Sequence, residues 1–259
     1  MRLAFLGTSG AVPSAERDTT SLVFEGTGAA VLVDCGGSPV GRLRRAGVDP
    51  LALTHVVVTH VHPDHAYGLP SLVQSLVLLR RRAPLDVVCH PEHVEPLRRL
   101  LEVFRLWGRA EPFTLRLAPV ALAPAAPAFE TGGLAFSAAP NDHGTMPNFA
   151  LRADVAGAAG RAVVYSSDTA PCDAVVALAR GADTLVHEAT FPHRHRGRFG
   201  AHSTAREAGE VAAAAGVRRL ILAHIEADYH GEVDALAAEA RAAFAGEVEV
   251  ARELASYPF

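Results

Sequence analysis

The sequence predicts a mixed α/β fold in a single domain, and one observation supports each part of this prediction. Short runs of β-branched and apolar residues, typical of strands, alternate with longer segments whose apolar residues have helical spacing. No internal repeat and no linker-like stretch divides the 259 residues. We therefore expect one domain that covers residues 1–259.

The expected strands are short apolar runs bounded by Gly, Pro or charged residues. In chain order they cover residues 2–6, 21–24, 30–33, 55–58, 85–89, 134–139, 149–153, 162–165, 184–186, 219–223 and 247–250. A Gly-rich turn follows the first of them, and a short glycine-containing loop joins the second to the third. Between residues 113 and 136 the pattern breaks into short pieces, and we expect residues 118–127 to form loops or short edge strands.

The expected helices have amphipathic spacing and recognisable ends. They cover residues 40–46, 69–82, 91–107, 173–179, 204–215 and 233–244. Gly47 closes the first, Pro91 suits the start of the third, and Ser203 is a suitable N-cap for the fifth.

Composition limits the classes of function. There is no lysine, so all 24 basic residues are arginine, and the formal net charge of −4 argues against a general polyanion binder. Three cysteines without a C-x-x-C pair favour a reducing compartment. With no signal peptide and no apolar run long enough for a membrane span, we expect a cytoplasmic protein. The 13 histidines supply the commonest metal ligand.

Histidines gather in one segment, Thr59-His60-Val61-His62-Pro63-Asp64-His65, directly after the expected strand 55–58. Positions i and i+2 of an extended chain face the same way, so His60 and His62 can bind one cation together. A turn at Pro63 would aim Asp64 and His65 toward a second cation. Two cations need more ligands, and His143, Asp168 and His224 each follow an expected strand.

This pattern resembles the signature of the metallo-β-lactamase superfamily: T-H-x-H-x-D-H, a distant His, Ser-Asp-Thr after a strand, and a final strand followed by His. Within the superfamily the chain resembles the tRNase Z branch. The matching segments are the opening Phe5–Pro13 with Arg17, Leu32–Gly36, Gly68–Leu72, Val186–Phe191 and His202–Ala205. The resemblance implies a four-layer αβ/βα sandwich, in which two mixed β-sheets pack together and helices cover the outer faces.

The resemblance also implies a ligand set for two divalent cations. His60, His62 and His143 would hold one, Asp64, His65 and His224 the other, and Asp168 would bridge them. A His and Asp donor set favours zinc, with manganese and iron as alternatives. The expected nucleophile is a hydroxide that bridges the two cations.

Three further features complete the expected site. Glu188 would orient His202, and His202 would give a proton to the leaving oxygen or steady the phosphate. Asp64 would shuttle protons besides binding metal. Arg194, Arg196 and Arg198 lie in the most basic stretch of the chain, where they could contact a phosphate or form a solvated loop.

The chain departs from the tRNA-processing members in one respect. Those proteins carry a long Gly/Pro- and Lys-rich arm, which in bacterial forms lies between the ligand His and the bridging Asp. Here only 25 positions separate His143 from Asp168, so this interval has no room for an arm. We therefore expect a dinuclear phosphodiesterase that acts on small or nucleotide-like, including cyclic, phosphodiesters. The alternatives are a lactone, β-lactam or thioester hydrolase, a metal-dependent sensor, and a tRNA 3′-processing endoribonuclease, which the missing arm and the acidic charge disfavour. We expect no membrane partner and no tRNA partner, and a homodimer is compatible with the resemblance.

Overall fold

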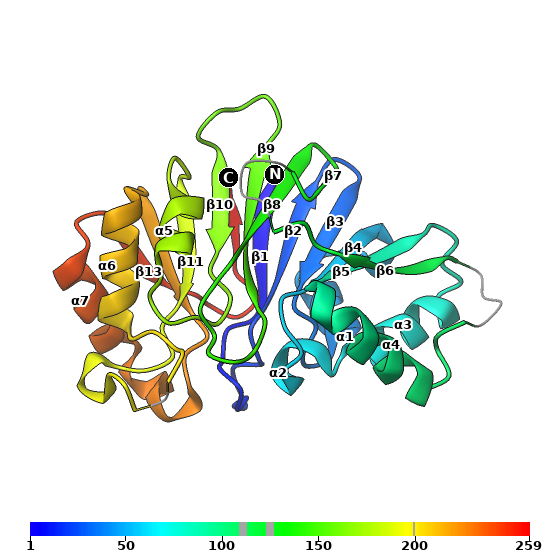
Figure 1. The fold of residues 1–259 in the computed structure, drawn as a ribbon, viewed down its shortest axis with the longest axis horizontal. Helices are drawn as coiled ribbons and strands as arrows, with labels where there is room; N and C mark the ends of the chain where they lie inside the picture. Colours follow the sequence, from blue (N-terminus) through cyan, green and yellow to red (C-terminus); the bar gives the residue numbers. More distant parts are fainter. Residues whose placement is uncertain (109–112, 123–126, 199) are drawn as a thin grey trace.

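Two β-sheets lie face to face, and helices cover the outer face of each (Figure 1). This computed structural model describes residues 1–108, 113–122, 127–198 and 200–259. The expected four-layer αβ/βα sandwich is confirmed. No helix in these ranges combines the length and apolar character that a membrane crossing requires.

The first sheet has the strand order β14-β1-β2-β3-β4-β5-β6. Its strands are β1 (Arg2–Gly7), β2 (Ser21–Gly26), β3 (Ala29–Val33), β4 (Leu53–Val58), β5 (Leu85–Cys89), β6 (Leu115–Pro119) and β14 (Ser256–Pro258). The strands from β14 to β3 pair antiparallel and those from β3 to β6 pair parallel.

The second sheet repeats this mixture, with the order β13-β12-β11-β10-β9-β8-β7. Its strands are β7 (Phe129–Thr131), β8 (Leu134–Pro140), β9 (Phe149–Val155), β10 (Ala162–Tyr165), β11 (Thr184–Glu188), β12 (Arg219–Ala223) and β13 (Glu247–Val250). Strands β10 to β13 run parallel, and β7 to β10 pair antiparallel.

Helices form the outer layers. On the first sheet they are α1 (Pro39–Arg45), α3 (Leu69–Leu78) and α4 (Val94–Val103), with the short α2 (Pro63–Ala66) at the sheet edge; on the second they are α5 (Asp173–Ala179), α6 (Ala205–Ala215) and α7 (Val233–Ala243). Short 3₁₀ helices are η1 (Pro50–Ala52), η2 (Pro91–His93), η3 (His193–His195) and η4 (Ala227–Glu232).

Three apolar clusters hold these layers together. One lies between the sheets and includes Phe24, Phe136 and Tyr165, another lies under α5 to α7, and the third lies under α1, α3 and α4. Burial of apolar surface is the main stabilising contribution to folding, so the facing sheets form a rigid base for the loops at their edge.

Several expected ends were wrong. The helix expected to reach residue 82 ends at Leu78, because Arg80 has a positive φ and Arg81 turns inward to donate to the carbonyls of Leu53 and Pro84. The helix expected over residues 91–107 begins as a 3₁₀ turn and ends at Val103.

The fifth helix and the edge strands also differ from expectation. The N-cap of α6 is Thr204 and not Ser203, since Thr204 and Glu207 form a reciprocal capping box. The edge strands β7 and β14 have three residues each, too few to show a strand pattern in sequence, and β6 runs into the segment expected to form loops or short edge strands. Of the expected loop or edge-strand segment, residues 123–126 lie outside the described residues.

Candidate metal centre

The loop after β4 carries four of the expected ligands. His60 and His62 follow the end of the strand at Val58, and Pro63 then begins α2, a single helical turn that carries Asp64 and His65. The fixed φ of proline suits the first position of a helix, so the expected turn is a helical one. A rigid strand end and a one-turn helix thus hold the segment in place.

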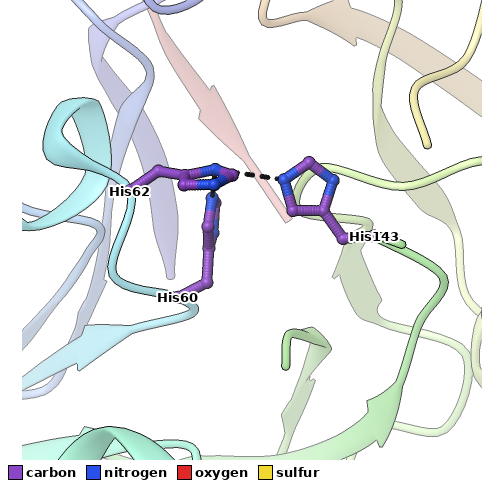
Figure 2. Close-up of side chains that lie close together, drawn as sticks. All are labelled: His60, His62 and His143. Atoms are coloured by element: carbon purple, nitrogen blue, oxygen red, sulfur yellow. Dashed lines mark hydrogen bonds between the residues drawn. The ribbon is translucent and has the colours of Figure 1, made fainter. Parts of the chain in front are cut away.

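Three imidazoles from the two halves of the fold converge on one point. The Nδ1 atom of His62 lies 2.9 Å from Nε2 of His60 and 3.1 Å from Nε2 of His143. His143 comes from the loop after β8, and its ring points toward the two rings from the loop after β4 (Figure 2). The three nitrogens lie within 4.8 Å of one another, a spacing that suits one cation.

A second group of four side chains lies beside the first. The Nε2 atom of His65 lies 3.1 Å from Oδ2 of Asp64 and 3.3 Å from Oδ2 of Asp168. The Nε2 atom of His224 lies 3.5 and 3.2 Å from the same two oxygens. Oδ2 of Asp168 is also 3.9 Å from Nε2 of His60, so this carboxylate lies between the two groups.

The donor atoms fit divalent cations. Nε2 of His65, Nε2 of His224 and Oδ1 of Asp168 are buried without a hydrogen-bond partner. Atoms that bind one tetrahedral zinc ion at about 2.1 Å lie about 3.4 Å apart, close to the spacings of the second group. A buried nitrogen or oxygen atom without a hydrogen-bond partner is unfavourable unless a cation satisfies it.

Residues with a strained backbone conformation cluster in and around the two ligand groups. Among the described residues, seven other than glycine have a positive φ, and four of these belong to the site or adjoin it: Asp34, Ser167, Ala201 and His224. Such conformations are unfavourable by roughly 1–3 kcal/mol each and are common at functional sites. The packed sheets therefore hold the site in a geometry that its local sequence does not favour.

Sequence reasoning missed the groups that orient the expected ligands. Asp34 is fully buried, and its Oδ2 lies 2.8 Å from Nδ1 of His65. The carbonyl of Ala201 accepts from Nδ1 of His143 at 3.0 Å. Asp34 lies in a segment that supported the family resemblance, which was the available signal. A backbone carbonyl carries no such signal.

Glu188 and His202 form a hydrogen-bonded pair next to the two ligand groups. Oε1 of Glu188 accepts from Nδ1 of His202 at 2.8 Å, and the ring of His202 stacks on that of His224. Burial lowers the pKa of His202, but the Glu188 carboxylate outweighs this effect and raises it to about 9. The side chain of Glu188 is fully buried, whereas that of His202 is 20% exposed. His202 can therefore reach both the ligand groups and solvent.

The basic stretch lies on the outer helices of the second sheet. Arg194 pairs with Glu232 at 2.8 Å and lies over the ring of Tyr229, and Arg196 pairs with Glu207 at 2.7 Å. Two of the three arginines expected at a phosphate are thus paired with carboxylates of η4 and α6. A phosphate would have to compete with those carboxylates.

Residues 29–225 match the family model of the β-lactamase superfamily domain. The chain belongs to the metallo-β-lactamase superfamily. Its fold and its His and Asp cluster therefore indicate a hydrolase that binds divalent metal ions. Among curated relatives, ribonuclease Z of Halorubrum lacusprofundi is 33% identical over 95% of this chain and 93% of its own length. Ribonuclease Z of Methanothermobacter thermautotrophicus is 32% identical over 88% of each chain.

Solved structures of the superfamily share the fold. The metallo-β-lactamase fold protein YhfI from Bacillus subtilis has a TM-score of 0.82 at 24% identity and covers 99% of this chain and 98% of its own. The short form of human tRNase Z has a TM-score of 0.80 at 22% identity and covers 100% of this chain and 99% of its own.

These relatives correct two expectations. The expected small phosphodiester substrate and the expected lack of a tRNA partner are wrong. The curated relatives that overturn them are named ribonuclease Z and match 88–95% of this chain. Net charge sums the entire surface, whereas RNA binding depends on where the cations lie, so a value of −4 was a poor criterion. The interval between His143 and Asp168 likewise tests only one location for RNA contacts.

Proposed function

We propose that this protein is an endoribonuclease of the ribonuclease Z type that cleaves precursor tRNA at its 3′ side, with zinc at both metal positions. The observation that carries the proposal is the Glu188–His202 pair beside the two ligand groups, because it supplies a proton donor where a phosphodiester would be cleaved. Curated relatives named ribonuclease Z support the choice of substrate.

The ligand assignment follows the two groups. His60, His62 and His143 would hold one cation, Asp64, His65 and His224 the other, and Asp168 would contact both. When bound, such a pair of cations activates water and stabilises the negative charge that develops on a phosphodiester. Asp64 is buried beside His65, with 9% of its side chain exposed, and would accept a proton from water besides binding metal.

His202 completes the arrangement. Glu188 accepts from Nδ1 of His202, which leaves Nε2 free to donate a proton to the leaving oxygen of the RNA. The four other hydrogen bonds that Glu188 accepts keep its carboxylate from rotating. The imidazole is therefore held in one orientation while the substrate binds.

The test uses zinc-loaded protein and a precursor tRNA transcript with a 3′ trailer. We expect cleavage at the junction between the tRNA and the trailer, mapped by gel and primer-independent end sequencing. His202→Ala should lower kcat by about 10²–10⁴-fold. His90→Ala, a histidine substitution at the start of η2, is the matched control and should retain the activity.

Two results would overturn the proposal. One is an intact precursor after prolonged incubation with protein that holds two zinc ions per chain. The other is cleavage of an unstructured RNA of the same length at the same rate as the precursor, which would remove tRNA as the preferred substrate.

A further inference from the structure

Two buried threonines occupy equivalent places in the two halves of the metal centre. In the N-terminal half, Oγ1 of Thr59 donates to Oδ1 of Asp34 at 2.9 Å and lies 3.2 Å from Nδ1 of His60. In the C-terminal half, Oγ1 of Thr190 donates to Oε2 of Glu188 at 2.7 Å and lies 3.1 Å from Nδ1 of His224.

The same carboxylates also bind a second imidazole directly. Asp34 contacts Nδ1 of His65 at 2.8 Å, and Glu188 contacts Nδ1 of His202 at 2.8 Å. Each half therefore uses one buried carboxylate to orient two histidines. One histidine binds the carboxylate itself, and the other binds it through a threonine hydroxyl.

The threonine hydroxyl determines which partner donates in each of these hydrogen bonds. A threonine hydroxyl has one hydrogen, and an ionised carboxylate can only accept, so the hydroxyl hydrogen of Thr59 or Thr190 goes to Asp34 or Glu188. Only lone pairs then remain for the histidine, and its Nδ1 must carry the proton. The opposite nitrogen, Nε2, is left with a free lone pair, as metal binding requires.

Burial keeps water from replacing the hydrogen bonds of Thr59 and Thr190. Asp34, Thr59 and Glu188 are 0% exposed and Thr190 is 5% exposed, so water has little access to replace these bonds. Ser167 donates to Oγ1 of Thr59 at 2.8 Å, which occupies its second lone pair. Nε2 of His224 is buried and lacks a hydrogen-bond partner, so the arrangement directs an unsatisfied nitrogen toward the second ligand group.

We propose that Thr59 and Thr190 are positioning residues that fix the tautomer of His60 and of His224, so that each presents Nε2 to a metal ion. This inference rests on the metal-binding part of the proposed function and is independent of the substrate. Thr190 also links the two roles of Glu188, because one carboxylate orients both His202 and a metal ligand.

The first experiment removes the hydroxyl and keeps the shape. Zinc affinity is measured by competition with a chromophoric chelator in wild type, Thr190→Val and Thr190→Ser. We expect Thr190→Val to weaken one of the two zinc sites by about 10–100-fold, the usual effect of losing a partner of a ligating histidine. Thr190→Ser keeps the hydroxyl and should restore the affinity to within about threefold of wild type.

Thr184 offers a matched control on the same strand. It is buried at the opposite end of β11, and its hydroxyl donates to the Asp183 carboxylate at 2.8 Å. Thr184→Val removes an equivalent hydrogen bond away from the metal centre and should leave both zinc affinities unchanged. Wild-type zinc affinity at both sites in folded Thr190→Val would refute the proposal, as would equal losses in Thr184→Val.

A second measurement needs no variant and covers the case in which Thr190→Val does not fold. Nitrogen-15 NMR of the zinc-loaded wild type identifies which ring nitrogen of each histidine carries a proton. We expect a slowly exchanging proton on Nδ1 of His60 and of His224. Zinc bound through Nδ1 of either ring would refute the proposal. Neither measurement involves RNA, so a failure of precursor cleavage would leave this inference intact.

Discussion

Replacing Glu188 with glutamine tests whether this carboxylate stabilises the fold as well as orienting His202. Oε1 accepts from the backbone N–H of Thr169 at 2.7 Å and from His202. Oε2 accepts from the hydroxyl of Thr190 at 2.7 Å and the backbone N–H of Ser203 at 3.0 Å, with a longer bond from the Thr190 backbone. The carboxylate is thus enclosed by five donors and has no access to solvent.

Glutamine cannot satisfy these donors. Its amide nitrogen must replace one oxygen, and in either orientation it faces a backbone N–H that cannot turn away. One unsatisfied buried donor is unfavourable by about 1–3 kcal/mol. Loss of the buried charge pair with His202 is larger, so we expect Glu188→Gln to lower the free energy of unfolding by about 3–5 kcal/mol.

Thermal unfolding of the metal-free protein, followed by circular dichroism, measures this loss. In a chain of this size 1 kcal/mol corresponds to about 2–4 °C, so the Tm should fall by about 6–20 °C. Glu207→Gln is the control, because Glu207 is also buried but serves a capping box that glutamine can maintain. Its partner Arg196 is exposed, so this change should lower the Tm by no more than about 4 °C. Equal melting of the two variants would refute the reasoning.

Three other predictions concern the core, the metal positions and the basic stretch. Phe136 is fully buried between Phe24 and Phe129, so Phe136→Ala should lower the free energy of unfolding by about 3–5 kcal/mol in the same melts. Phe104 is exposed, and the control Phe104→Ala should change the free energy of unfolding by less than about 0.5 kcal/mol. Asp168→Ala removes the oxygen that lies between the two ligand groups, and elemental analysis should find fewer than two zinc ions per chain; full zinc content would contradict the assignment. If Arg194, Arg196 and Arg198 contact RNA phosphates, replacing all three with alanine should make the slope of log(kcat/KM) against log[salt] shallower by about 2–3, and an unchanged slope would exclude them.

Local chemistry pointed to the candidate donor residues. The spacing of His60 and His62 after a strand, and the proline that begins α2, are features of adjacent residues. Strand-end positions likewise identified His143, Asp168 and His224 as candidates. These inferences need only the period of a strand and the coordination preferences of metals, which act over a few residues.

Other features depended on residues far away in the sequence. The helix ends at Leu78 and Val103 follow from positive φ values at Arg80 and Arg105, which packing selects. The edge strands β6, β7 and β14 each pair with one neighbouring strand that offers hydrogen bonds, and β7 and β14, of three residues each, are too short for their own sequences to indicate them.

The sequence by itself determined which side chains could bind metal and what layered fold would carry them. Only the tertiary structure decided that His62 and His143, 81 positions apart, bring ring nitrogens within 3.1 Å. It also decided which ring nitrogen faces the metal positions. Asp34, the Ala201 carbonyl and Thr190 contact Nδ1 of three histidines, so that Nε2 of each is left for a cation; these histidines are His65, His143 and His224. The physical reason is that hydrogen-bond partners of a buried imidazole are set by the packing of the two sheets, and local sequence carries no record of that packing.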